Sequence, residues 1–169
     1  SELGGRPVMW KTGHSLIKNK MAENNCKIGG EMSGHIFFAD DYFGYDDAIY
    51  VAGRLIQMLS NTEKTLSELK SVIPKYISTP EIRLEAESDE KKFEIAKMAE
   101  DYFSKNYDCI TVDGVRVKFK EGWGLVRASN TQPVIVCRFE GNTLDNMNKI
   151  QSIILDKLKE FGNLKIGSH

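Results

Sequence analysis

The sequence has few cysteines, no long apolar run and almost no net charge, and each shortage excludes a class of protein. Its 169 residues carry three cysteines and a formal net charge of -1. No apolar run approaches the roughly 20 residues of a membrane-spanning helix, and residues 1–10 lack the apolar core of a signal peptide. A chain this close to neutral has no electrostatic reason to bind nucleic acid or an acidic membrane surface.

The three cysteines are scattered along the chain. Cys26, Cys109 and Cys137 form no Cys-x-x-Cys pair and have no histidine at metal-ligand spacing. An odd number of isolated thiols is typical of a reducing compartment and of buried, unreactive positions. Because 41% of the residues are hydrophobic and 28% are charged, the composition is that of a globular protein. We therefore expect a soluble cytoplasmic protein.

Two prolines mark the best boundary in the sequence. The segment Pro74–Pro80 separates two differently patterned parts, and its prolines disfavour continuing a helix or a central strand. We expect a first part at 1–73, a hinge at 74–80 and a second part at 81–169. The chain does not begin with Met, and Val8–Trp10 has the pattern of a strand whose partners lie upstream. We therefore expect a piece of a longer protein.

The first part has the pattern of an α/β structure with helices and a mixed sheet. The expected elements are a helix from Thr12 or Ser15 to Asn24–Asn25, strands on both sides of residues 30–35, a helix from Asp46 or Asp47, and a short helix over 66–72. The second of these helices carries an apolar stripe. The stripe is formed by Ile49, Ala52, Leu55, Ile56 and Leu59.

The second part has an α+β pattern. Ile82–Ala86 alternates as a half-exposed strand does, and a helix follows from Asp89. Asp113-Gly114 between alternating strands predicts a hairpin turn in which both residues adopt positive φ. Two more strands and a closing amphipathic helix complete the pattern. We expect a mainly antiparallel sheet of four to five strands, with two helices on one face.

The loop Gly30-Glu31-Met32-Ser33-Gly34-His35 concentrates chemistry between two short strands. A loop on a rigid base presents its side chains to a ligand, and the carboxylate of Glu31 can accept hydrogen bonds from two hydroxyls at once. A polar hairpin tip without a ligand fits the residues equally well.

A second loop, Arg127–Pro133, joins two predicted strands. Its guanidinium, hydroxyls and amide suit a phosphate, although Ser-Asn-Thr is also ordinary turn chemistry.

Other charged positions have simpler interpretations. The pairs Asp40–Asp41 and Asp46–Asp47 are interpreted as helix caps and surface carboxylates, because no third kind of metal ligand accompanies them. Lys91–Lys92 is interpreted as a solvated helix face. The aromatic residues Tyr42, Phe43 and Tyr45 are expected to pack in a core or against another domain.

Two motifs in this order resemble the α-D-phosphohexomutase family. Lys11-Thr12-Gly13-His14 followed by GEMSGH is similar to the family's sugar-recognition loop, and Arg127–Pro133 is similar to its phosphate-binding loop. Within the family the chain most resembles the phosphomannomutase/phosphoglucomutase branch. The resemblance covers nearly the whole chain but only the C-terminal part of such an enzyme, the end of domain 3 and all of domain 4.

The resemblance implies a role for each matching residue. Glu31 and Ser33 would hydrogen-bond the ring 3- and 4-hydroxyls, His14 would contact the ligand, and His35 would lie near the reacting phosphate, where an imidazole can transfer a proton. The residues implied to hold the phosphate that is not transferred are Arg127, Ser129, Asn130 and Thr131.

The reaction implied is an isomerisation by intramolecular phosphoryl transfer. Mannose or glucose 6-phosphate and 1-phosphate would interconvert through a phosphoserine and a 1,6-bisphosphate, with Mg²⁺ on a DGDGDR-type loop. This chain has no Asp-Gly-Asp string and no serine in the family's nucleophile context. We therefore expect no metal ligands and no turnover from this chain alone, and we expect hexose phosphates and the missing N-terminal domains as its partners.

Two alternatives stay open. One is a phosphoglucosamine mutase, although that branch usually has GEQSGH and a glycine where this chain has Met32 and Asn130. The other is a non-catalytic module that binds phosphosugars or proteins.

Overall fold

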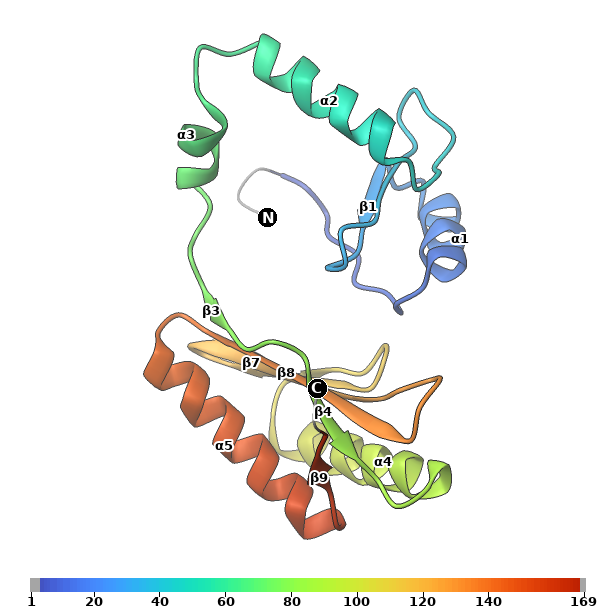
Figure 1. The fold of residues 1–169 in the computed structure, drawn as a ribbon, viewed down its shortest axis with the longest axis vertical. Helices are drawn as coiled ribbons and strands as arrows, with labels where there is room; N and C mark the ends of the chain where they lie inside the picture. The colour runs from blue at the N-terminus through green and yellow to red at the C-terminus, as the bar shows by residue number, and fades with distance from the viewer. Residues whose placement is uncertain (1–3, 168–169) are drawn as a thin grey trace. The chain divides into compact units, whose positions relative to one another are not determined.

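The computed structural model describes residues 4–167 and consists of two compact units that divide after Pro74 (Figure 1). The first unit contains three helices and a pair of strands. Its elements are α1 (His14–Asn24), β1 (Ile28–Gly30), β2 (Ile36–Phe38), α2 (Ala48–Ser60) and α3 (Leu66–Ser71). These are the helices and the two loop-flanking strands that the sequence predicts.

Local capping signals set two of these helix starts. The side chain of Asp47 accepts hydrogen bonds from the backbone of Ile49 and Tyr50, which confirms one of the two caps proposed for α2. Thr65 and Glu68 form a reciprocal capping box at α3. The start of α1 differs from the prediction. Gly13 occupies its cap position, and no side-chain hydrogen bond caps it.

The sheet of the first unit is smaller than expected. β1 and β2 form an antiparallel ladder that pairs Ile28 with Phe38, and the described residues contain no mixed sheet in this unit. Val8–Trp10, expected as a strand, is not a strand here. A strand needs a neighbouring backbone for its ladder of hydrogen bonds, and the sheets of the described residues do not include this segment. The expected sheet therefore lacks its other strands.

The second unit is an antiparallel sheet with two helices packed on it (Figure 1). Its elements are β3 (Ile77–Ser78), β4 (Ile82–Glu85), α4 (Asp89–Asn106), β5 (Cys109–Ile110), β6 (Val115–Phe119), β7 (Gly122–Ala128), β8 (Val134–Gly141), α5 (Leu144–Phe161) and β9 (Lys165–Ile166). The strand order is β5-β6-β7-β8-β4-β9, and β3 also pairs with β8. Two-residue strands enlarge the sheet to seven strands, beyond the four to five expected.

The core of the second unit lies between this sheet and its helices. Phe103 of α4, Phe139 of β8 and Ile154 of α5 are completely buried there. Cys137 shares this core, and burial strongly raises the pKa of its thiol. That environment agrees with the unreactive role predicted for it.

Part of the expected hinge belongs to the second unit. Ile77 and Ser78 pair with β8, and Thr79 exchanges hydrogen bonds with the backbone of Phe139 at 2.9 and 3.1 Å. Thr79 is also buried. The sheet therefore holds residues 77–79, which the sequence placed within the hinge 74–80.

The Asp-Gly hairpin forms with a longer turn than predicted. Ile110 pairs with Arg116, so four residues separate β5 from β6. Gly114 has a positive φ of 71°, whereas Asp113 does not adopt positive φ. The prediction of positive φ at both residues was wrong, because the longer loop needs the left-handed conformation only at the glycine.

Among the described residues, no helix has the length and apolar character that crossing a membrane requires.

Candidate functional site

The loop between β1 and β2 is a tight turn held by backbone hydrogen bonds. The backbone N–H of Glu31 donates to the carbonyl of His35 at 2.8 Å, and that of Gly34 donates to the carbonyl of Glu31 at 3.0 Å. Gly34 has a φ of 96°, which a side chain would strain. Ser33 lies exposed on this turn.

Glu31 is fixed by the start of α1. One of its carboxylate oxygens, Oε1, accepts the backbone N–H of Gly13 at 2.8 Å. The other, Oε2, lies 3.7 Å from Nε2 of His14, and the side chain of Glu31 is only 9% exposed. One oxygen of this carboxylate therefore anchors the loop, and the second lies near His14.

His14 and His35 lie edge to face, with their ring centroids 4.3 Å apart. The ring of His14 also contacts the fully buried Phe37 of β2, at a centroid separation of 5.5 Å. Three residues that the sequence singled out, His14, Glu31 and His35, therefore come together in one cluster.

Asp46 completes this cluster, and sequence reasoning missed it. Its Oδ2 lies 2.6 Å from Nδ1 of His35 and 3.7 Å from Nε2 of His14. A backbone bridge between Phe37 and Asp46 brings the segment before α2 alongside β2. The interpretation of Asp46–Asp47 as caps and surface carboxylates is confirmed, because Asp47 caps α2 and Asp46 is exposed, but it overlooked the contacts of Asp46 with the two histidines. A signal was present, because one helix start needs only one capping carboxylate.

The cluster can orient an imidazole for proton transfer. If Nδ1 of His35 carries its proton, that proton is donated to Asp46, and Nε2 is left free to accept one. A carboxylate that fixes the tautomer in this way also stabilises the imidazolium form. Hydroxyl groups brought to the loop would meet the Glu31 carboxylate and the Ser33 hydroxyl.

A second ionic cluster joins α2 to the segment that follows β2 in the same unit. Arg54 reaches both carboxylate oxygens of Asp40, at 3.0 and 3.3 Å, and its guanidinium lies over the ring of Phe38 at 4.6 Å. The hydrogen bond from Arg54 lowers the pKa of Asp40. The pKa of Asp47 is lowered as well, chiefly by the hydrogen bond from the Tyr42 hydroxyl.

The second candidate loop joins β7 to β8 in the second unit. Ser129 is 9% exposed, and its Oγ accepts the backbone N–H groups of Thr131 and Gln132, both at 3.3 Å. Asn130 and Thr131 are exposed, and Arg127 is half-buried near the end of β7. The structure thus places Ser129, Asn130 and Thr131 on the loop and Arg127 in the strand that leads into it. Ser129 shapes that loop, and its hydroxyl hydrogen is still available to a ligand.

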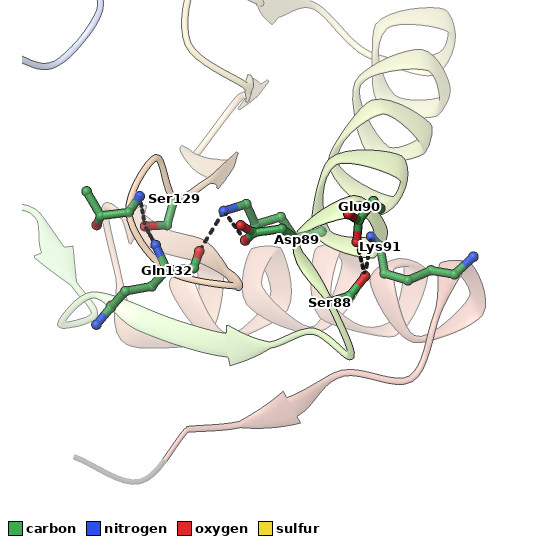
Figure 2. Close-up of polar contacts among 8 residues, drawn as sticks. Ser88, Asp89, Glu90, Lys91, Ser129 and Gln132 are labelled. Atoms are coloured by element: carbon green, nitrogen blue, oxygen red, sulfur yellow. Dashed lines mark hydrogen bonds and ion pairs between the residues drawn. The ribbon is translucent and has the colours of Figure 1, made fainter.

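A buried lysine supports this loop from α4. Lys92 is 2% exposed, and its ammonium donates to the carbonyl of Gln132 at 2.7 Å and contacts Asp89 Oδ1 at 2.7 Å. Figure 2 shows the loop residues Ser129 and Gln132 beside the start of α4, where Asp89 lies. The interpretation of Lys91–Lys92 as a solvated face was therefore wrong for Lys92. No local pattern distinguishes it from Lys91, because its partner lies 40 residues away.

Comparisons with known proteins identify both units. Residues 1–76 match the family model "Phosphoglucomutase/phosphomannomutase, alpha/beta/alpha domain III", and residues 81–157 match the model of the same family's C-terminal domain. A phosphomannomutase/phosphoglucomutase of Pseudomonas aeruginosa is 48% identical over 159 residues, which are 94% of this chain and 34% of the relative. A phosphoglucomutase of Neisseria gonorrhoeae is 40% identical over 153 residues, 89% of this chain and 33% of the relative.

A solved structure gives the same result. The chain is similar to a phosphoglucomutase/phosphomannomutase family protein from Burkholderia thailandensis, with a TM-score of 0.82 and 37% identity. The match covers 96% of this chain and 35% of the solved one. The chain thus spans about a third of the length of these relatives.

Proposed function

Because this chain belongs to the phosphoglucomutase/phosphomannomutase family, we propose that it is the C-terminal part of an enzyme that interconverts hexose 6-phosphates and hexose 1-phosphates. Glucose and mannose phosphates are the proposed substrates. The observation that carries this proposal is the cluster that His14 and Asp46 form with Glu31 and His35 of the β1–β2 loop. It combines hydroxyl-binding carboxylates with an imidazole held for proton transfer.

Each loop has its own task in this proposal. Glu31 and Ser33 hold ring hydroxyls, His14 contacts the ligand, and His35 moves a proton to or from the hydroxyl that exchanges its phosphate. In the other unit, Arg127 pairs with the phosphate that is not transferred. Ser129, Asn130 and Thr131 supply further donors to the same phosphate. Such a transfer depends mainly on positioning and charge neutralisation, which these residues provide.

The phosphoserine and Mg²⁺ are assigned to the part of the enzyme that this chain does not span. Within residues 4–167, the groups able to hold a metal ion are His14, His35 and Asp46. Two imidazoles do not suit Mg²⁺, which prefers oxygen ligands in octahedral geometry. The described residues therefore do not fit this cofactor. Without its nucleophile, the chain should show no mutase turnover by itself.

A chimera tests the proposal. This chain would replace the matching C-terminal third of the Pseudomonas aeruginosa relative, and interconversion of glucose 1- and 6-phosphate would be assayed. We expect an active chimera and no turnover from the 169-residue chain. Glu31→Gln should raise KM more than it lowers kcat, whereas Asp46→Asn should lower kcat by about 100-fold, the lower end of general acid–base effects. A folded but inactive chimera would overturn the proposal.

Binding to the chain itself is a second test. An amide-resolved NMR titration with glucose 1-phosphate should shift the signals of residues 127–131 and, to a smaller extent, those of 31–35. Shifts in the first set alone would limit the proposed binding role to the second unit. A well-folded sample silent at both loops would contradict binding by the isolated chain, and the chimera assay would then decide the proposal for the whole enzyme.

A further inference from the structure

We propose that His14, His35 and Asp46 also form a binding site for a zinc-type divalent cation, with Glu31 as a fourth donor within reach. One ligand atom from each of the three residues lies within 4.8 Å of the others. This site is separate in chemistry from the Mg²⁺ assigned to the missing part of the enzyme. The inference does not depend on the proposed mutase function.

The distances suit a small tetrahedral cation after modest side-chain movement. Zinc binds imidazole nitrogen and carboxylate oxygen at about 2.0–2.2 Å, so its ligand atoms lie about 3.3–3.5 Å apart. Asp46 Oδ2 is 2.6 Å from His35 Nδ1 and 3.7 Å from His14 Nε2. The first distance has to lengthen and the second to shorten, and rotation of partly exposed rings permits both. The imidazoles are 46% and 42% exposed, so a cation can reach them.

The donor set selects the class of metal. Imidazole suits Zn²⁺, Co²⁺, Ni²⁺ and Cu²⁺, whereas Mg²⁺ and Ca²⁺ prefer oxygen alone. Two carboxylates near two imidazoles give the cluster a net negative charge when the imidazoles are neutral. Outer contacts already orient the donors, because Gly13 fixes Glu31 and the ring of Phe37 packs against His14. Such outer contacts are typical of protein metal sites.

Binding exchanges a proton for the metal without any redox change. In the metal-free cluster, Nδ1 of His35 lies at hydrogen-bond distance from Asp46. On binding, the metal takes this position, and the imidazole proton moves through solvent to Nε2, so the ring stays neutral. Three protein donors leave one tetrahedral position, which Glu31 or an oxygen ligand from solvent can fill. The metal and a hexose phosphate would use the same side chains and should therefore compete.

Cobalt titration of the 169-residue chain tests the site directly. Co²⁺ should give visible d–d absorption that saturates at one equivalent, and Zn²⁺ should abolish it. The titration would be repeated with Cys26→Ser and Cys109→Ser, because these thiols are only half-buried and can bind the same metals. A spectrum that disappears with the thiols would overturn the proposal, as would the absence of saturation at millimolar Co²⁺.

Matched variants identify the ligands. His14→Gln and His35→Gln should each weaken Co²⁺ binding by more than about tenfold, because losing even an outer-shell partner of a metal site has that effect. The controls are His169→Gln, which changes the remaining histidine of the sequence, and Asp41→Asn, which changes an exposed carboxylate in the same unit. Both should bind as the unmodified chain does. Loss of binding in His169→Gln, or unchanged binding in both cluster variants, would overturn the proposal.

Imidazole ¹⁵N spectra provide a readout that folding defects do not imitate. With Zn²⁺ bound, Nδ1 of His35 should carry the shift of a metal-ligating nitrogen, and Nε2 should carry the proton. A His35 ring unaffected by saturating Zn²⁺ would contradict the assignment. His14 begins α1 and His35 lies in the β1–β2 loop. If one histidine variant fails to fold, metal binding by the other variant still tests the site. The glucose 1-phosphate titration, carried out without metal, tests the proposed function separately.

Discussion

At the scale of single residues, the Lys92 ammonium joins α4 to the loop that carries Arg127 and Ser129. It donates to the carbonyl of Gln132 and contacts the Asp89 carboxylate, both at 2.7 Å, while its own side chain is almost completely buried. Lys92→Met keeps most of the apolar stem but removes both polar contacts. We expect the free energy of unfolding of the second unit to fall by about 1.5–3 kcal/mol, the usual contribution of a hydrogen bond to a charged group.

Urea unfolding followed at the amide signals of β8 measures this loss. Lys91→Met is the matched control, because Lys91 is exposed and its ammonium pairs with the exposed Glu94. An exposed pair contributes at most about 1 kcal/mol. In the chimera, Lys92→Met should also raise KM for glucose 1-phosphate more than it lowers kcat. Equal stability of the two variants would show that Lys92 does not hold the loop.

Asp40 gives the first unit an acid-sensitive contact. The hydrogen bond from Arg54 lowers its folded-state pKa below the ordinary value of 3.8. The unfolded chain therefore binds this proton first as the pH falls. The stabilisation is complete above the unfolded pKa and is lost as the pH drops through the lowered folded value.

Thermal unfolding of α2 between pH 6 and pH 2.5 measures this dependence. We expect Asp40→Asn to lower the unfolding temperature at pH 6. We also expect this temperature to decrease less as the pH falls than it does in the unmodified chain. Part of the decrease should persist, because the pKa of Asp47 is lowered too. An unchanged decrease in Asp40→Asn would contradict a role for this pair.

At the scale of helices and strands, sequence prediction succeeded where the determining contacts are local. Asp47 caps α2 through residues two and three positions away, and Thr65 caps α3 in the same way. Prediction failed where the outcome depends on a residue far along the chain or on a strand ladder that does not form. Val8–Trp10 has the composition of a strand, but a strand also needs a neighbouring backbone.

The candidate site shows the same division. His14, Glu31 and His35 could be selected from the sequence because their motifs are contiguous. For Asp46 the sequence offered only a second carboxylate beside the cap, and for Lys92 it offered no signal, because the roles of both depend on which backbone lies beside them. The bridge from Phe37 to Asp46 and the contact from Lys92 to Gln132 are tertiary facts. The local sequence around these residues does not specify the two contacts.

Gly122 on β7 lies against the backbone of β8 with no room for a side chain. It pairs with Gly141, and a Cβ atom there would overlap the carbonyl oxygen of Glu140. Because backbone cannot rotate away as a side chain can, Gly122→Ala should destabilise the second unit by about 1–3 kcal/mol or more. At Gly124 the added Cβ would chiefly meet the tip of Ile154, which can adopt another rotamer.

Urea titrations of the two alanine variants test this difference. Gly124→Ala should lose less stability than Gly122→Ala, and the loss should be accompanied by shifted methyl signals from Ile154. A smaller loss of stability in Gly122→Ala than in Gly124→Ala would mean that the β7 and β8 backbones move apart more easily than the α5 side chains change rotamer.

At the scale of the whole molecule, the two units differ in how much of their apolar surface is covered. The second unit buries one continuous core between α4, α5 and the sheet. In the first unit, Met21 and Phe37 are the described hydrophobic residues counted as buried. The apolar stripe of α2 forms as predicted but stays uncovered, with Ile49 87% and Ile56 64% exposed. A helix draws most of its stability from packing such a face.

Hydrogen exchange should therefore separate the units within one sample. We expect the α2 amides of the 169-residue chain to exchange much faster than those of α5, because local opening costs little where few apolar contacts are lost. In the chimera, the rest of domain III should cover the α2 stripe, so α2 should become protected while α5 changes little. Exchange followed by mass spectrometry on peptides 48–60 and 144–161 measures both. If α2 is as protected as α5 in the chain alone, the first unit needs no upstream partner, and its exposed stripe is compatible with an independently stable fold.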